Sequence, residues 1–139
     1  MQERDPIEIA TRALLHRDRS RHEVDERLAR AGIADDKRSE ALDTLGRVGY
    51  IDDQRFAGAR AGVLANRGYG DEWIRLDLAE HGLDPETVAG AIAALEPEAE
   101  RAAALVERLG RTAKTGARLA RKGFGREALQ TALGFDVAE

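Results

Sequence analysis

Residues 67–85 read RGYGDEWIRLDLAEHGLDP, and this stretch decides the fold of the whole chain. It contains the hexad Leu-Ala-x-x-Gly-apolar, which begins at Leu78 and has its glycine at Gly82. The same hexad begins again at Leu28 and at Leu119. The stretch is therefore the centre of the second of three copies of a longer repeat.

The copies agree at further positions without a gap. A leucine stands eighteen residues before each hexad glycine, and an alanine followed by an aliphatic residue stands nine and ten residues after it. These columns are Leu14, Leu64 and Leu105, then Ala41-Leu42, Ala91-Ile92 and Ala132-Leu133. A period of about 40 to 50 residues is typical of helical arrays, in which each unit buries part of its apolar face against its neighbour.

The repeats predict an all-α fold of three tandem three-helix repeats that form an elongated, curved array. We place a lead-in at residues 1–10, repeat 1 at 11–49, a joint and repeat 2 at 50–99, and repeat 3 at 100–139. The chain is 35% charged and only 4% aromatic, so it can bury only thin aliphatic cores. Small helical units meet that restriction better than a broad sheet does.

Composition also restricts the setting. The chain has no cysteine, which excludes disulfides and thiolate metal sites. No apolar run approaches the roughly 18 residues of a membrane span, and the first ten residues lack the basic-then-apolar form of a signal peptide. We therefore expect a cytoplasmic protein without a membrane partner.

Charge is unevenly distributed along the chain. The net charge is −4 at pH 7, which argues against a dedicated nucleic-acid binder. Residues 11–49 carry +1, residues 50–100 carry −7 and residues 101–139 carry +4. An acidic middle beside a basic end suits a protein or a protein–nucleic acid partner, and incidental asymmetry of a solvated surface would look the same.

Several short signals predict where helices begin and end. Ser20 and Glu23 form an S-x-x-E capping box, and Asp84 before a proline is a strong helix start. We expect Asp35 to be the N-cap of the third helix. Gly32 follows the second helix as the residue that enters the left-handed region without steric cost.

Helical periodicity gives an inner face that we expect to be buried. Its members are Ile7, Ala10, Leu14 and Leu15; Val24, Leu28 and Ala31; Ala41, Leu42, Leu45 and Val48; and Phe56, Ala59, Val63 and Leu64. Trp73 lies one position before the buried column of Val24 and Ile74. We expect it to cover the seam between repeats, with an anchor for a partner as the alternative.

Two segments together carry a resemblance to a known family. Residues 49–57, GYIDDQRFA, form the joint between repeats 1 and 2, and residues 67–83 follow as R-G-Y-G-x-x-x-I-R-x-x-L-x-x-x-G-L. In this order the segments resemble the RecX family of recombination regulators, and the resemblance extends from about residue 9 to residue 135. Repeat 3 departs from it, because the connection at residues 96–100 is short and Thr115-Gly116 replaces an apolar pair.

The resemblance implies a function as well as a fold. Members of this family bind within the helical groove of RecA recombinase assembled on single-stranded DNA. They restrain strand exchange, ATP hydrolysis and coprotease activity, and so act on homologous recombination, DNA repair and the SOS response. The resemblance therefore implies a regulator whose partner is the RecA filament.

The candidate partner-binding residues lie in repeats 2 and 3. Four cations at positions i, i+4, i+7 and i+8 form a basic stripe opposite Leu119. They are Lys114, Arg118, Arg121 and Lys122. The polar loop of repeat 2 and the helix after it add Arg67, Tyr69, Trp73 and Arg75. The stripe has no base-reading pattern, so any contact with single- or double-stranded DNA should go to the backbone and depend on salt.

The chain shows no sign of catalysis. Its three histidines are not at the spacing of a helical ligand pair, and it contains no phosphate-binding G-x-x-x-x-G-K-[ST] loop. Asp52 and Asp53 are expected to cap a helix rather than to bind a cation. We therefore expect a monomeric non-enzyme without a cofactor or a metal. A direct DNA-binding module and a helical scaffold for an unrelated partner remain the alternatives.

Overall fold

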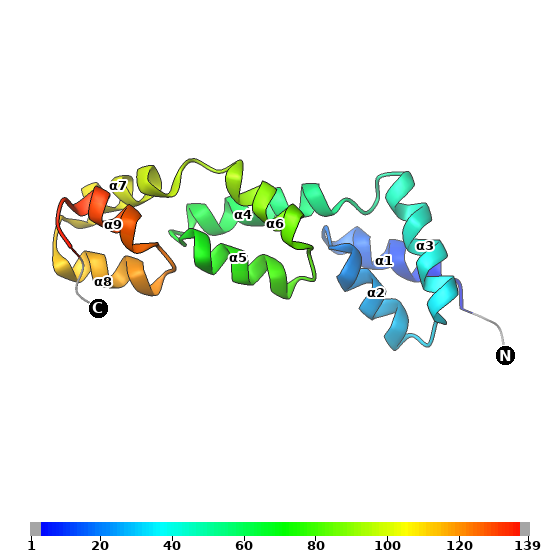
Figure 1. Ribbon diagram of the computed structural model, residues 1–139. Helices are drawn as coiled ribbons and strands as arrows, with labels where there is room; N and C mark the ends of the chain where they lie inside the picture. The colour runs from blue at the N-terminus through cyan, green and yellow to red at the C-terminus, as the bar shows by residue number, and fades with distance from the viewer. Residues whose placement is uncertain (1–3, 137–139) are drawn as a thin grey trace.

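The protein is described from a computed structural model, and the description applies to residues 4–136. Within that range the secondary structure is entirely α-helical, which confirms the predicted all-α class (Figure 1). The helices are α1 (Pro6–His16), α2 (Arg21–Arg30), α3 (Asp35–Arg47), α4 (Asp53–Asn66), α5 (Asp71–Glu80), α6 (Pro85–Ala93), α7 (Glu98–Leu109), α8 (Ala113–Arg121) and α9 (Arg126–Leu133).

The helices form three consecutive bundles of three. Figure 1 shows the bundles in a row, with the two chain ends at opposite ends of an elongated molecule. Each bundle encloses its own small core. The largest fully buried side chains include Leu28 and Leu45 in repeat 1, Leu64, Ile74 and Leu78 in repeat 2, and Leu119, Leu129 and Leu133 in repeat 3. The predicted tandem arrangement of three-helix units is confirmed.

Most of the predicted helix signals act as expected. Ser20 and Glu23 make both hydrogen bonds of the capping box, and Asp84 accepts a hydrogen bond from the backbone N–H of Thr87. The assignment of Asp35 as an N-cap is wrong. The N-cap is Ala34, whose side chain cannot cap, and Asp35 is the first helical residue, where its charge complements the positive end of α3.

The inner face was predicted too broadly. Val48 is 62% exposed because α3 ends at Arg47 and the chain folds back through Gly49, so that Ile51 rather than Val48 enters the core. In α4, the buried face consists of Phe56, Ala57, Ala61 and Leu64. Leu15, Ala59 and Val63 are exposed, because each lies on the outer face of its own helix.

The second helices of the three repeats, α2, α5 and α8, meet end to end along one edge of the molecule (Figure 1). The C-terminal turn of α5 contacts the N-cap of α2, and the C-terminal turn of α8 contacts the N-cap of α5. This line of helices joins the repeats and carries most of the predicted site residues.

Candidate partner-binding surface

The joint between repeats 2 and 3 contains direct backbone hydrogen bonds between the start of α5 and the end of α8. The N–H of Gly70 donates to the carbonyl of Lys122 at 2.8 Å, and the N–H of Glu72 donates to the carbonyl of Gly123 at 3.2 Å. Gly123 has φ +94°, and a Cβ there would lie 2.6 Å from the Cβ of Trp73. The hexad glycine of repeat 3 therefore allows direct contact between the two helix ends.

Side chains from α7 lock the same joint. The Glu98 carboxylate accepts from the N–H of Asp71 at 2.6 Å and from the N–H of Gly125 at 3.1 Å. Arg101, whose side chain is only 9% exposed, pairs with Asp71 at 2.7 Å and donates to the carbonyl of Tyr69 at 3.2 Å. The loop that contains the predicted residues Arg67 and Tyr69 is thus held from both sides.

Three of the predicted site residues are stacked at this joint. The Tyr69 and Trp73 rings lie 4.1 Å apart, and the Lys122 ammonium lies 4.3 Å from the Tyr69 ring centre. The same ammonium donates to the carbonyl of Arg67 at 2.8 Å. Trp73 is 37% exposed and covers the seam between repeats, as expected.

We expected Lys122 to belong to the exposed basic stripe of α8, but it does not. Helix α8 ends at Arg121, so Lys122 is its C-cap, and its side chain turns back to repeat 2. Lys114, Arg118 and Arg121 are exposed on α8, and their side chains make no hydrogen bond or ion pair with any other residue that the structure describes. The surface stripe therefore consists of these three cations.

Arg75 lies on α5, one turn from the joint. Its Nε donates to the Glu72 carboxylate at 3.0 Å, which raises the pKa of Arg75 and lowers that of Glu72. The pair is exposed to solvent, so it positions the two side chains more than it stabilises the fold. Arg75 thus reaches the surface as half of an ion pair.

The joint between repeats 1 and 2 also connects the end of one second helix to the start of another, but through side-chain hydrogen bonds. The Ser20 hydroxyl donates to the carbonyl of His81 at 2.7 Å. The Asp53 carboxylate accepts from the N–H of Arg21, the first residue of α2, at 2.8 Å. Asp53 and Glu98 are each the first residue of their helix, and each caps the second helix of the preceding repeat. Asp52 caps its own helix through the N–H of Arg55.

Alignment on the hexad glycines shows a basic site that the sequence analysis missed. Arg27 and Arg30 of α2 stand at the positions of Arg118 and Arg121 in α8. In repeat 2 the same positions hold Asp77 and Glu80, so these two aligned positions are basic, acidic and basic along the line of second helices. The three-column alignment already contained this signal.

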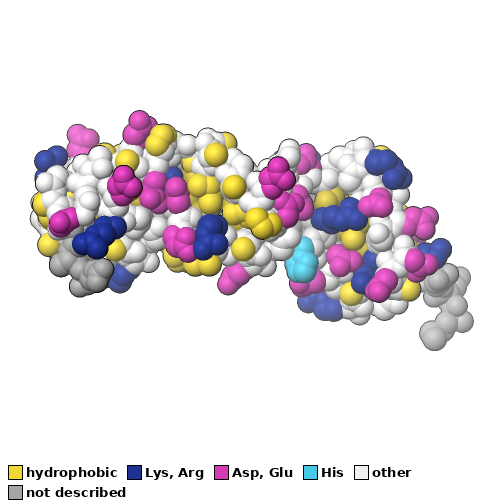
Figure 2. Space-filling view, in the orientation of Figure 1, with side chains coloured by type: hydrophobic (Ala, Val, Ile, Leu, Met, Phe, Trp, Pro, Cys, Tyr) yellow, Lys and Arg dark blue, Asp and Glu magenta, His cyan; other side chains and the backbone are white. Residues whose placement is uncertain are grey.

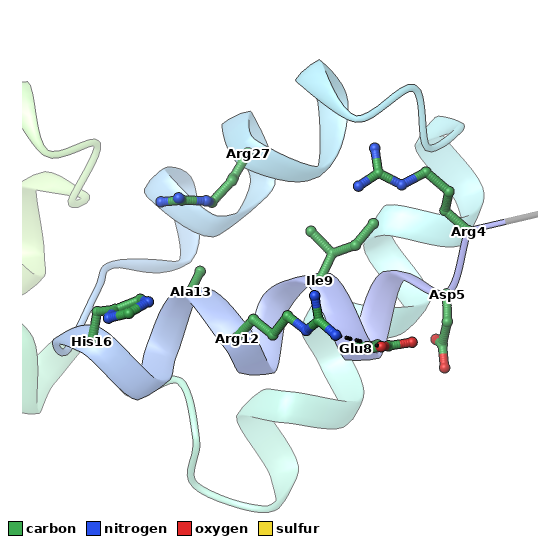
Figure 3. Close-up of a pocket in the computed structure, with 8 residues that line it drawn as sticks. All are labelled: Arg4, Asp5, Glu8, Ile9, Arg12, Ala13, His16 and Arg27. Carbon is green, nitrogen blue, oxygen red and sulfur yellow. Dashed lines mark hydrogen bonds and ion pairs between the residues drawn. The ribbon is translucent and has the colours of Figure 1, made fainter.

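Arg27 lines a groove of about 510 Å³ between α1 and α2 (Figure 3). Ile9 and Ala13 of α1 form its apolar floor, and Arg4 stands near the start of that helix (Figure 3). Burial lowers the pKa of the neighbouring Arg19, and repulsion from Arg17 and Arg27 lowers it further. The N-terminal repeat therefore has its own group of cations, among which Arg12 is paired with Glu8 and Arg17 with Glu23.

Asp77, an acid in the middle of the line of second helices, stabilises the packing of repeat 2. Arg60 of α4 makes two hydrogen bonds of 2.8 Å to Asp77, whose side chain is 11% exposed. The Arg60 guanidinium holds the pKa of Asp77 below its usual value. This pair ties α5 to α4. Figure 2 shows Lys and Arg groups mainly toward the two ends of the molecule and hydrophobic groups over its middle.

Other site types find no support in the described part of the chain. No three carboxylate or imidazole groups within residues 4–136 lie close enough to hold a metal ion together. In the same range no helix has the length and apolarity needed to cross a bilayer. The chemistry available at the described surface is that of cations, carboxylates and a few exposed apolar side chains.

Known proteins share both the sequence and the fold. The family described as RecX, second three-helix domain, matches residues 52–92. Regulatory protein RecX of Xanthomonas axonopodis pv. citri (strain 306) is 35% identical over 147 aligned residues, covering 99% of this chain and 91% of that protein. Regulatory protein RecX of Stenotrophomonas maltophilia (strain R551-3) is 34% identical and covers 96% of this chain.

The solved structure of RecX from Lactobacillus salivarius superposes with a TM-score of 0.82 over 93% of this chain and 92% of that chain. Its 22% identity shows the fold alone. The curated relatives, in contrast, match along almost their whole length. Identity of 35% across nearly all of both sequences, in a chain built of three such helical units, shows that this protein belongs to the RecX family.

Proposed function

We propose that this protein is a cytoplasmic, non-enzymatic regulator that binds the RecA recombinase filament and inhibits its recombinase, ATPase and coprotease activities. Family membership across nearly the whole chain is the observation that carries the proposal. The elongated array supports it, because three linked units can contact an extended partner at several points (Figure 1). Inhibition of this kind needs no chemistry of its own, since a ligand that holds filament subunits out of register is enough.

The two basic ends are the proposed contacts. Lys114, Arg118 and Arg121 at one end, and Arg27 and Arg30 at the other, are exposed cations on one line of helices. Such groups suit acidic protein surfaces and phosphates. Arg67, Tyr69 and Trp73 lie beside the first group at the second joint, where Lys122 contacts the Arg67 carbonyl and the Tyr69 ring. We assign Lys122 a supporting role there.

Hydrolysis of ATP by the cognate recombinase on single-stranded DNA tests the proposal. The rate should fall as this protein is titrated in, and the effect should weaken at higher salt. Replacing Lys114, Arg118 and Arg121 together with alanine should reduce inhibition about tenfold or more, because three desolvated cationic contacts are lost. Unchanged hydrolysis with folded protein and an active filament would refute the RecA assignment.

A matched control removes the same charge elsewhere. Lys37, Arg47 and Arg108 are exposed on α3 and α7 and belong to neither proposed contact, and their triple alanine variant has the same net charge as the test variant. It should inhibit like the parent protein. Equal loss in both variants would show that net charge, not the α8 stripe, controls inhibition.

Direct contact with the DNA backbone is a second candidate function. The observation that favours it is the set of exposed cations on α8, whose side chains make no ion pair with any other residue that the structure describes. Binding to naked DNA should then be equal for all sequences and fall steeply with salt. Binding that occurs only in the presence of recombinase would favour the protein partner instead.

A further inference from the structure

Repeat 2 has an apolar groove that neither the joints nor the basic ends use. It lies between α5 and α6 and has a volume of about 380 Å³. Leu83, Val88 and Ile92 lie deepest, while Ala79, Ala89 and Ala93 form low walls. Because alanines leave both walls low, another polypeptide backbone can approach closely. The groove therefore has the shape that accepts a helix or an extended segment.

The apolar surface continues beyond the groove. Leu76 is 52% exposed and stands one helical turn before Ala79 on α5. Trp73 stands one turn earlier still. Figure 2 shows a continuous hydrophobic area over the middle of the molecule, larger than at either end. An exposed patch of this kind on a chain that is 35% charged marks an interaction surface.

Charge around the groove selects the partner. Residues 50–100 carry a net charge of −7. Glu80 and Glu86 are exposed on the two helices that form the groove, and Asp84 is exposed in the turn between them. Arg75 lines it, but its charge is balanced by its pairing with Glu72. The apolar surface is therefore set in a negative field, which attracts a cationic partner and repels phosphates.

We propose that the α5–α6 groove binds an amphipathic helix of a partner protein, with an apolar face flanked by lysine and arginine. Apolar side chains at i, i+3 and i+4 would enter the groove, and the flanking cations would meet Glu80, Asp84 and Glu86. A second copy of this chain is disfavoured, because a symmetric dimer through this face would place acidic edges against each other. The proposal goes beyond the RecA assignment and does not depend on it.

A synthetic helix tests the groove directly. The probe is a fluorescein-labelled peptide of leucine and lysine, about 14 residues or four helical turns long, with leucines on one face. Anisotropy should rise when the full chain is added. A peptide with the same composition but scattered leucines, and one with glutamate in place of lysine, should each bind at least about tenfold more weakly.

Paired variants locate the binding. Ala89→Lys places a cation on the groove wall and should weaken binding of the leucine–lysine peptide about tenfold or more. Ala29→Lys makes the same change at an exposed position of α2 in repeat 1 and should leave binding unchanged. Circular dichroism checks that both variants fold, and methyl chemical shifts of Val88 and Ile92 should move with the peptide.

Three results would overturn the proposal. Equal affinity for the glutamate peptide would remove the charge argument. Absence of binding at millimolar peptide would remove the groove as a helix site. Concentration-dependent dimerisation of the free chain that Ala89→Lys abolishes would identify a second copy as the occupant. Each result leaves inhibition of recombinase a separate question, because no recombinase is present in these measurements.

Discussion

The two joints between repeats have the same arrangement of helices but are held by different chemical groups. In each, the first residue of a repeat's first helix is an acid that caps the second helix of the repeat before it: Asp53 at the first joint and Glu98 at the second. At the second joint, the backbone N–H groups of Gly70 and Glu72 also donate to the carbonyls of Lys122 and Gly123. At the first joint, Ser20 supplies the equivalent bond from its hydroxyl.

The glycines show the same difference. A Cβ at Gly70 would lie 2.4 Å from the backbone nitrogen of Phe124, which cannot move alone. At the first joint, a Cβ at Gly82 would meet the side chain of His22, which is exposed and can rotate. The second joint is therefore a backbone contact with little freedom. The first is a side-chain contact that can open more easily, so we infer that repeats 2 and 3 form the firmer unit.

The largest expected effect comes from filling the backbone contact. Gly70→Ala should destabilise the protein by about 2 to 3 kcal/mol, because the added methyl group forces repeat 3 away from α5. Urea unfolding measures the loss, and hydrogen exchange at Glu72 should accelerate in the variant.

A matched glycine controls for helix propensity. Gly90 is exposed in α6, and a Cβ there would meet nothing within 4 Å. Gly90→Ala should therefore stabilise by about 0.5 to 1 kcal/mol. If Gly70→Ala behaved like Gly90→Ala, the close backbone contact at the second joint would be incorrect.

The next largest effect is the difference in stability lost when an arginine is removed from each joint. Arg101 is largely buried, its Nε has no partner among the described groups, and removing it leaves Asp71 unpaired. Arg101→Ala should cost about 2 kcal/mol. Arg55 pairs with Asp18 at 3.1 Å on the exposed surface of the first joint, and Arg55→Ala should cost less than about 1 kcal/mol. Equal costs in thermal unfolding would show that the joints do not differ in burial.

The capping acids provide a finer test. Glu98→Ala removes acceptors from two backbone N–H groups, those of Asp71 and Gly125, and should cost about 1 to 2 kcal/mol. Asp53→Ala removes one acceptor, from Arg21, and should cost about 1 kcal/mol. Amide exchange by NMR should accelerate at the residues just named in each variant. A change confined to the mutated helix would argue that the acids do not connect repeats.

The smallest effect depends on pH and lies in repeat 2 beside the first joint. Because Arg60 lowers the pKa of Asp77, this carboxylate stabilises the fold above its unfolded pKa of about 3.9. The contribution is lost as pH falls through the lower folded value. Asp77→Asn should therefore cost about 1 kcal/mol at pH 7 and progressively less as pH falls below the unfolded value. A cost that stayed constant with pH would exclude the ion pair as its source.

Local rules in the sequence were enough for the fold. The hexads fixed the number of units, and the box at Ser20 and the cap at Asp84 marked helix starts because each acts within a few residues. The rules failed where the chain reverses direction. Val48 has the right helical phase for burial, but the turn at Gly49 removes it from the core.

The candidate site was harder to predict because its geometry depends on neighbouring repeats. Lys122 follows Arg118 and Arg121 at helical spacing, yet its ammonium turns to the Tyr69 ring and the Arg67 carbonyl across the joint. No spacing within one repeat contains that contact. Asp53 likewise looks like a second local cap, although its partner is in another unit.

The end-to-end line of second helices gives the molecule a direction. At each joint the carbonyl end of one helix meets the amide end of the next, so the opposite partial charges of their dipoles offset each other. What remains is a positive pole at the start of α8, which has no acid in its first turn, and a negative pole at the end of α2, which Arg27 and Arg30 compensate. The two ends of the array therefore differ in charge, and a partner surface that distinguishes them would bind the array in one orientation only.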